Sequence, residues 1–253
     1  MEAAANDPKR FTLDRDSIEI VRLDNPTPAG ADPLPPFPGG GTPGGGDPIS
    51  EIDRIVNLAK KIFDIIKENR PVVDITTSYA NAVPEGMTHW SQLAGWTPPQ
   101  TNTYGFYAKN GWGSRVVEVT YQVIRQHSGS YKGKGKFLNS VTVQPLHVSV
   151  SWGYKFSMKF EAPTVSNVGT SEDPVASMLA RLNWSIDTVL QHDEGTSIYD
   201  LQGDGAYREI GGPFKSAARE GARASIQRAA GLFVPAAALR GAESMRAVAG
   251  RAW

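Results

Sequence analysis

The residues best suited by type to bind a ligand are the aromatic side chains between positions 89 and 112. They stand among glycine, proline, asparagine and threonine, a composition typical of loops. Rings on loops at one end of a sandwich could stack on sugar faces or lie among lipid headgroups. Alternatively, most of them complete the core, since tryptophan is usually largely buried. The candidate ligand-binding residues are Trp90, Trp96, Tyr104, Tyr107 and Trp112.

A second candidate surface is the lysine-rich segment at residues 130–137. Lys132, Lys134 and Lys136 alternate with glycine, so in an extended chain all three lysines share one face. Glycine between them lets a partner approach closely, and the lysines could meet phosphate headgroups or another polyanion. The alternative is a charged edge strand whose lysines prevent aggregation between sheets.

Motifs for catalysis are missing from the sequence. There is no Gly-x-Ser-x-Gly, phosphate-binding loop or His-Glu-x-x-His, and residues 111–113 lack the third glycine of a dinucleotide site. The four histidines, His89, His127, His147 and His192, stand alone without a second histidine at metal-ligand spacing. We therefore predict a non-enzymatic protein without a cofactor or metal.

Composition sets broad limits on the class of protein. The chain of 253 residues is long enough for one large domain with tails, or for two small domains, and it has no cysteine. The N-terminus shows no apolar core of a secretory signal, and no stretch is long and apolar enough to span a bilayer as a helix. We expect a soluble protein of unassigned compartment. No nucleic-acid partner is predicted.

The pattern from Leu146 to Phe160 predicts the fold class. Every second residue is apolar, which places one face of an extended strand against a core. The stretch is either one long strand or two strands joined at Trp152-Gly153, and the change of phase at Pro145 predicts a bulge or break. The apolar series is Leu146, Val148, Val150, Trp152, Tyr154, Phe156, Met158 and Phe160.

Further elements complete an antiparallel β-sandwich. Apolar residues at three- and four-residue spacing predict an amphipathic helix over residues 49–69, packed beside the sandwich, with Asp47 as its N-cap. Residues 174–190 fit a helix or a strand, and their second half favours a strand. The other strands are predicted at residues 72–79, 104–109, 115–125, 131–138, 141–143, 164–167 and 197–201.

Three regions follow from these assignments. Residues 1–48 form a flexible tail and linker rich in proline and glycine, in which Phe11–Leu13 and Ile18–Val21 could add an edge strand. Residues 49–205 form the domain of helix and sandwich. Residues 206–253 form a basic tail rich in alanine and arginine, with a helix possible over 214–233.

Three functions remain open at the level of sequence. The first is a non-catalytic module that binds a glycan or a membrane surface through the aromatic loops and the lysine strand. The second is a structural or assembly subunit whose tails hold it to a protein partner or to further copies. The third is a membrane-perforating protein in which the helix of residues 49–69 swings out on its linker.

Overall fold

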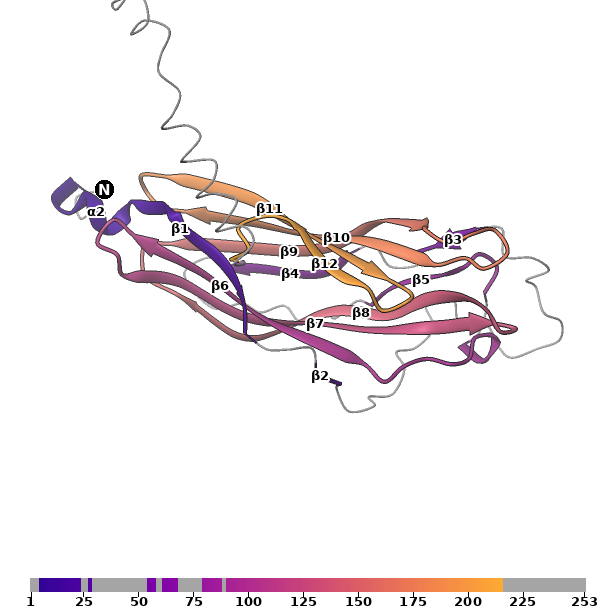
Figure 1. The fold of residues 1–253 in the computed structure, drawn as a ribbon. Coiled ribbons are helices and arrows are strands. Elements are labelled where there is room, and N and C mark those ends of the chain that lie inside the picture. The colour runs from indigo at the N-terminus through magenta and orange to yellow at the C-terminus, as the bar shows by residue number, and fades with distance from the viewer. Residues whose placement is uncertain are drawn as a thin grey trace, which may run out of the picture. The chain divides into compact units, whose positions relative to one another are not determined.

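The computed structural model describes residues 5–23, 27–28, 54–57, 61–67, 79–87 and 90–215. Most of these residues form antiparallel strands in two sheets packed together, with very little helix (Figure 1). The predicted antiparallel sandwich is therefore confirmed. All described residues but Lys215 belong to one compact unit, Met1–Phe214. The tail helix predicted over 214–233, nearly all of the linker and the strand at 72–79 lie outside the described residues.

The two sheets are built from different parts of the chain. The strands of the first sheet all lie between residues 13 and 150, whereas the second sheet joins β4 to four consecutive strands, β9 to β12. In order across the first sheet lie β1 (Leu13–Arg22), β6 (Gln100–Asn110), β7 (Arg115–Tyr131), β8 (Lys134–Val150), β5 (Ala80–Pro84) and β3 (Ile55–Val56), and β2 (Thr27–Pro28) also pairs with β6. Across the second lie β12 (Tyr207–Gly211), β11 (His192–Gln202), β10 (Ala176–Asp187), β9 (Lys155–Asn167) and β4 (Lys61–Lys67).

Alternating side chains of both sheets fill the core between them. On β7, Val117, Val119, Tyr121 and Val123 are fully buried, and Phe160 on β9 is fully buried too. Burial of each such side chain contributes about 1.5–3 kcal/mol. A polar contact also crosses the core, since the hydroxyl groups of Tyr121 and Tyr199 lie 2.6 Å apart. The Tyr104 hydroxyl on β6 likewise lies 2.9 Å from the Tyr207 hydroxyl on β12. The sheets are thus joined by apolar packing and by hydrogen bonds between phenols.

The stretch from Leu146 to Phe160 forms two strands rather than one. β8 ends at Val150 and β9 begins at Lys155, so the break falls at the predicted position around Trp152 and Gly153. A register shift opposite Pro145 confirms the predicted bulge. The apolar side chains of β9 are buried, whereas Leu146 of β8 is half exposed.

Residues 174–190 mostly form strand β10, as their second half indicated. Pairing with β9 on one side and β11 on the other places this strand inside the second sheet. Its alternate residues Met178, Leu182 and Ile186 face the core. Two partner strands satisfy its backbone groups on both edges, which overrides the helical spacing of its first half.

The helix predicted over residues 49–69 is wrong. Within the described part of that range, Ile55–Val56 form β3 and Lys61–Lys67 form β4, which pairs with β9. Isoleucine and valine are β-branched and fit a strand better than a helix, and pairing with an edge of the sheet decides between the two. The membrane-perforating hypothesis, which required this helix, loses its basis.

The sandwich also extends beyond residues 49–205. β1 pairs with β6, and β12 pairs with β11. The chain after β12 then reaches β1, because the Ile20 N–H donates to the Pro213 carbonyl oxygen at 2.8 Å and Ile20 bridges Phe214. The segments on either side of the expected domain therefore meet each other at its edge.

Candidate binding site at the hairpin end

Three tight turns lie at the same end of the sandwich, on the left in Figure 1. Residues 111–114 join β6 to β7, residues 151–154 join β8 to β9, and residues 188–191 join β10 to β11. Antiparallel pairing brings them together, since Val117 lies opposite Val150 and Lys155 opposite Asp187. We call these three turns, together with the short helix α2 (Pro8–Phe11), the hairpin end.

The helix α2 contacts all three turns through its backbone and the residues that follow it. The Gly111 N–H donates to the carbonyl oxygens of Lys9 (3.1 Å) and Thr12 (2.9 Å). The Tyr154 hydroxyl donates to the Arg10 carbonyl oxygen at 2.5 Å. In the third turn, the Gln191 side-chain oxygen accepts from the Leu13 N–H at 3.0 Å. Residues distant in sequence thus form one rigid end.

Local sequence explains why a helix of only four residues forms here. Asp7 is its N-cap, and the Asp7 carboxylate accepts a hydrogen bond from the Arg10 N–H at 3.3 Å. Pro8 occupies the first helical turn, where its fixed φ and missing N–H cost nothing. So short a helix is not stable alone, and the contacts with the three turns hold it in place.

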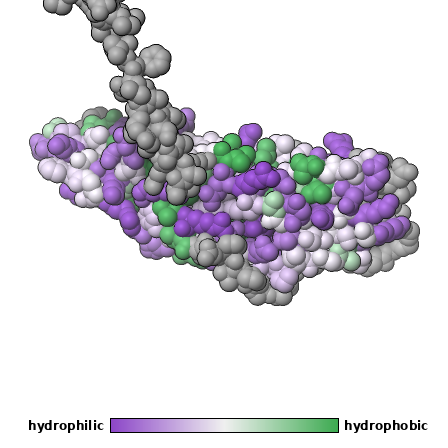
Figure 2. Space-filling view, in the orientation of Figure 1, coloured by the Kyte–Doolittle hydropathy of each residue, from purple (hydrophilic) through white to green (hydrophobic). Residues whose placement is uncertain are grey.

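Each turn presents large apolar side chains to solvent. Trp112 is 62% exposed and Trp152 is 70% exposed, while the third turn presents Val189 (57%) and Leu190 (52%). On the face seen in Figure 2, hydrophobic residues form small separate patches among hydrophilic ones. Tryptophan exposed to this extent is unusual, because the ring is normally buried for most of its area. This concentration at one end marks a surface for a partner or ligand.

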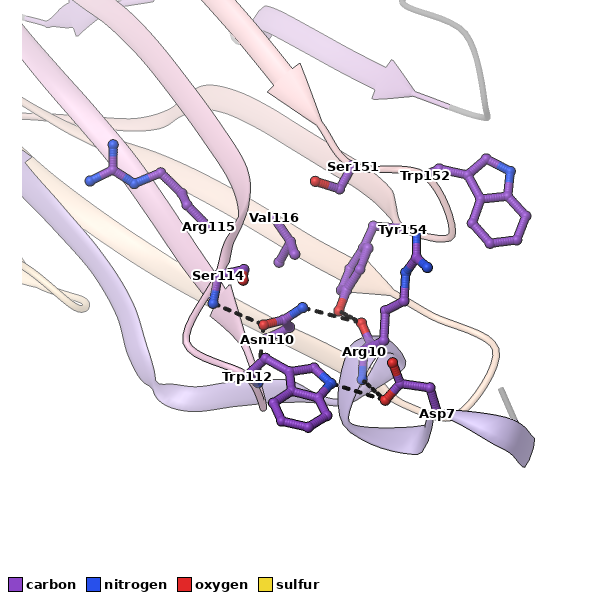
Figure 3. A pocket seen from close by; sticks show the side chains of 10 residues that line it. All are labelled: Asp7, Arg10, Asn110, Trp112, Ser114, Arg115, Val116, Ser151, Trp152 and Tyr154. Carbon is purple, nitrogen blue, oxygen red and sulfur yellow. Dashed lines mark hydrogen bonds between the residues drawn. The ribbon is translucent and has the colours of Figure 1, made fainter. Parts of the chain in front are cut away.

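A pocket of about 430 Å³ lies between α2 and the first two turns (Figure 3). Figure 3 shows Trp112 and Trp152 on opposite sides of it, with Arg10 and Tyr154 between them. Burial raises the pKa of the Tyr154 phenol, so this hydroxyl remains a hydrogen-bond donor. The lining residues are Asp7, Arg10, Asn110, Trp112, Ser114, Arg115, Val116, Ser151, Trp152 and Tyr154.

Asn110 holds the first turn in the shape that displays Trp112. Its side-chain oxygen accepts hydrogen bonds from the backbone N–H groups of Trp112 (3.1 Å) and Ser114 (3.0 Å). The Trp112 indole N–H donates to the Asp7 carboxylate at 2.9 Å. The ring is therefore fixed through two of its neighbours although its faces are open to solvent.

Cationic side chains surround the exposed rings. The Lys9 ammonium lies 5.3 Å from the centre of the Trp112 ring, and the Arg10 guanidinium lies 6.0 Å from that of Trp152. Such cation–π contacts favour this placement of positive charge. Beside the third turn, hydrogen bonding to Asp187 raises the pKa of His192. The hairpin end thus combines apolar tips with mostly cationic groups behind the first two.

The structure places the predicted lysines at the opposite end. Lys132 lies in the turn from β7 to β8, Lys134 begins β8, and all three lysines are exposed. β7 has 17 residues between this turn and the one that holds Trp112. At about 3.3 Å per residue, the two ends lie roughly 50 Å apart. The lysines and Trp112 therefore do not form one surface.

The other predicted aromatic residues divide among three environments. Tyr104 is fully buried in the core, so its ring is not available to a ligand. Tyr107 is half-buried, with the Arg115 guanidinium 4.2 Å above its ring. Trp96 is half-buried and packs against Gly129, near the lysine end. The side chain of Trp90 lies outside the described residues, and Trp112 alone reaches the hairpin end.

Several residues of the hairpin end escaped the sequence analysis. Trp152 belongs to the apolar series of Leu146 to Phe160, and the sequence predicts either one strand through it or two strands joined at Trp152-Gly153, but no exposed ring. Val189 and Leu190 stand at the end of a predicted strand without a turn signal such as glycine or proline. Arg10 and Asp7 belonged to a segment predicted to be a tail. The missing information is which distant turns lie side by side.

Among the described residues, no group of three or more histidine, cysteine or acidic side chains could hold a metal ion. No helix within the described ranges is both long and apolar enough to cross a bilayer. Comparisons with models of protein families, with curated protein sequences and with solved structures gave no match. Function must therefore be argued from the geometry of the hairpin end.

Proposed function

We propose that this protein is a non-catalytic binding module that docks on the surface of a lipid membrane through the hairpin end. One observation carries the proposal. Four large apolar side chains, all more than half exposed, lie on three turns at one end of the sandwich: Trp112, Trp152, Val189 and Leu190.

The energetics favour reversible docking. Moving each of these partly exposed side chains out of water contributes about 1–2 kcal/mol, or about 5 kcal/mol for the four together. A single lipid anchor gives binding of similar, marginal strength. Tryptophan suits the boundary between headgroups and acyl chains, because its ring is apolar and its N–H is polar.

The positive charge at the hairpin end also favours binding to an anionic membrane surface. Lys9 and Arg10 lie over the rings of Trp112 and Trp152, so their charges accompany the rings to a surface of anionic headgroups. Asp7 is acidic but is engaged with the Trp112 indole. The lysines at the opposite end cannot touch the same flat surface, so the proposal rests on the hairpin end alone.

A glycan is the second candidate ligand, and the pocket favours it. Trp112 and Trp152 flank a space with serine and asparagine in its lining, which suits stacking on a sugar and hydrogen bonds to its hydroxyls. Val189 and Leu190 do not line this pocket. Glycan binding should therefore depend on the two tryptophans, whereas membrane docking should depend on the third turn as well.

Co-sedimentation with vesicles tests the proposal. The vesicles contain phosphatidylcholine with a minor fraction of phosphatidylserine. Leu190→Ser should lower the bound fraction, and Trp152→Ala should lower it more. Val168→Ser is the matched control, because Val168 is as exposed as Leu190 (52%) but follows β9 at the opposite end.

Two results would overturn the proposal. In the first, the unmodified protein stays in the supernatant at every vesicle concentration. In the second, Leu190→Ser and Val168→Ser bind alike. Retention on a glycan array that is lost in Trp152→Ala but kept in Leu190→Ser would instead establish the second candidate.

A further inference from the structure

We infer that Arg10 binds a phosphate group in the pocket of the hairpin end, and that this phosphate belongs to a lipid headgroup. The source of the phosphate rests on the proposed function. The binding chemistry rests only on the residues of the pocket, so the two can be tested separately.

The guanidinium of Arg10 lies beside two aromatic rings and pairs with no described carboxylate. It lies 5.9 Å from the centre of the Phe11 ring and 6.0 Å from that of Trp152. It forms no ion pair within the described part of the chain, so its N–H donors remain open to a ligand. A planar guanidinium can donate two parallel hydrogen bonds to a phosphate, which makes arginine the usual residue for this task.

The backbone of Arg10 is anchored at both polar atoms. Its N–H donates to the Asp7 carboxylate at 3.3 Å, and its carbonyl oxygen accepts from the Tyr154 hydroxyl at 2.5 Å. The side chain therefore starts from a fixed point at the pocket (Figure 3). A preorganised donor loses less conformational entropy on binding than one on a free tail.

The carboxylate of Asp7 is the one acidic group among the residues that line the pocket. Its Oδ1 atom already accepts from the Arg10 N–H and from the Trp112 indole at 2.9 Å. Asp7 thus serves the helix and the ring rather than the guanidinium. Because Arg115 pairs with Glu118, Arg10 is the cation of the lining that no described carboxylate pairs.

Arg115, the other arginine of the pocket, differs from Arg10 because its guanidinium already has an acidic partner. Its guanidinium lies 3.4 Å from the Glu118 carboxylate and 4.2 Å from the centre of the Tyr107 ring. In Figure 3 it points away from Arg10. Ser151 also lines the pocket, but in Figure 3 Tyr154 lies between it and Arg10. The phosphate is therefore assigned to the guanidinium of Arg10.

Equilibrium dialysis of the full chain with inorganic phosphate and with glycerol 3-phosphate tests the binding chemistry. We expect one saturable site with a dissociation constant in the millimolar range. Arg10→Gln should weaken it about tenfold, as expected for loss of hydrogen bonds to a charged group. Lys132→Gln removes an equally exposed charge at the opposite end and should bind as the unmodified protein does. Circular dichroism confirms that both variants are folded.

Absence of a saturable site, or equal binding by Arg10→Gln and Lys132→Gln, would overturn the inference. A second arm identifies the source. Vesicles of phosphatidylcholine with phosphatidic acid should bind the protein and lose about tenfold in affinity with Arg10→Gln. Binding of free phosphate without binding to these vesicles would contradict the lipid source and the proposed function but keep the pocket chemistry. Vesicle binding that Arg10→Gln leaves unchanged would contradict the role of Arg10 alone.

Discussion

The Tyr154 hydroxyl donates a hydrogen bond to the carbonyl oxygen of Arg10 at 2.5 Å, across 144 positions of sequence. This bond fastens α2 to the turn between β8 and β9. It therefore connects the segment that carries Arg10 to the turn that carries Trp152, and both line the pocket.

Removing this bond should weaken both the fold and the pocket. Tyr154→Phe removes the shorter of two hydrogen bonds to the Arg10 carbonyl oxygen and leaves the 3.5 Å bond from the Asn110 amide. It should lower the free energy of unfolding by about 1 kcal/mol, measured by urea denaturation. Tyr107→Phe is the control, since no hydrogen bond of the Tyr107 hydroxyl exists within the described residues. An equal loss in both variants would contradict the role assigned to the Tyr154 hydroxyl.

Gly153 is required by both backbone and space. Its φ of +88° disfavours any other residue, and an added Cβ would lie 2.5 Å from Cε1 of Phe11. Gly153→Ala should therefore destabilise the protein by about 2–3 kcal/mol. Gly113→Ala shares the positive φ (+77°) but meets no atom within 4 Å, so about 1 kcal/mol is expected. Thermal melting of the pair separates the steric cost from the backbone cost.

The turn between β7 and β8 places a lysine where glycine or asparagine is favoured. Lys132 and Gly133 have φ values of +48° and +78°, as in the two-residue turns of β-hairpins. Lys132→Asn should stabilise the protein by about 0.5–1 kcal/mol. Lys134→Asn, one residue beyond the turn, should give no gain in the same denaturation assay. A loss of stability in Lys132→Asn would show that the lysine side chain outweighs the backbone preference.

Acid should destabilise the fold through His127. Burial lowers the pKa of this histidine, and its Nε2 has no hydrogen-bond partner in the part of the chain that the structure describes. The unfolded chain takes up a proton near pH 6.5 that the folded chain resists. The free energy of unfolding should therefore fall as pH drops below about 6.5.

The variant His127→Asn should flatten this dependence of stability on pH. His192 acts in the opposite sense, because its pKa is raised: its stabilising contact is present at low pH and lost as pH rises through the raised pKa. Urea denaturation between pH 5 and pH 8 measures both contributions. A profile that is the same in His127→Asn as in the unmodified protein would contradict the prediction.

Strands could be predicted wherever apolar and polar residues alternate without interruption. Val117 to Val123 and Phe156 to Phe160 alternate strictly, and both lie in strands with buried apolar faces. The range 61–67 was misread, because neighbouring isoleucines satisfy helical spacing as well as strand propensity. What decides there is a partner strand, and a single sequence does not show which segments will pair.

The candidate site could be predicted only in part, for a related reason. Trp112 stands between two glycines, which marks it as a turn residue. Trp152 continues an apolar series in phase with Val150 and Tyr154, so periodicity assigned it to the core. At a hairpin turn, however, a side chain that continues the apolar alternation has no paired strand or facing sheet to cover it, and it is exposed to solvent. Arg10 joins the site through contacts with Tyr154 and Gly111 that no local pattern encodes.

Insertion of the hairpin end into a membrane can be measured through its own tryptophans. Vesicles made with brominated phosphatidylcholine quench indole fluorescence only at short range, so rings that enter the bilayer lose emission. The account predicts strong quenching for the unmodified protein, loss of most of it in the double variant Trp112→Phe/Trp152→Phe, and full quenching in Trp96→Phe, whose altered ring lies at the opposite end. Equal emission with brominated and ordinary vesicles, or quenching that survives in the double variant, would contradict docking through the hairpin end.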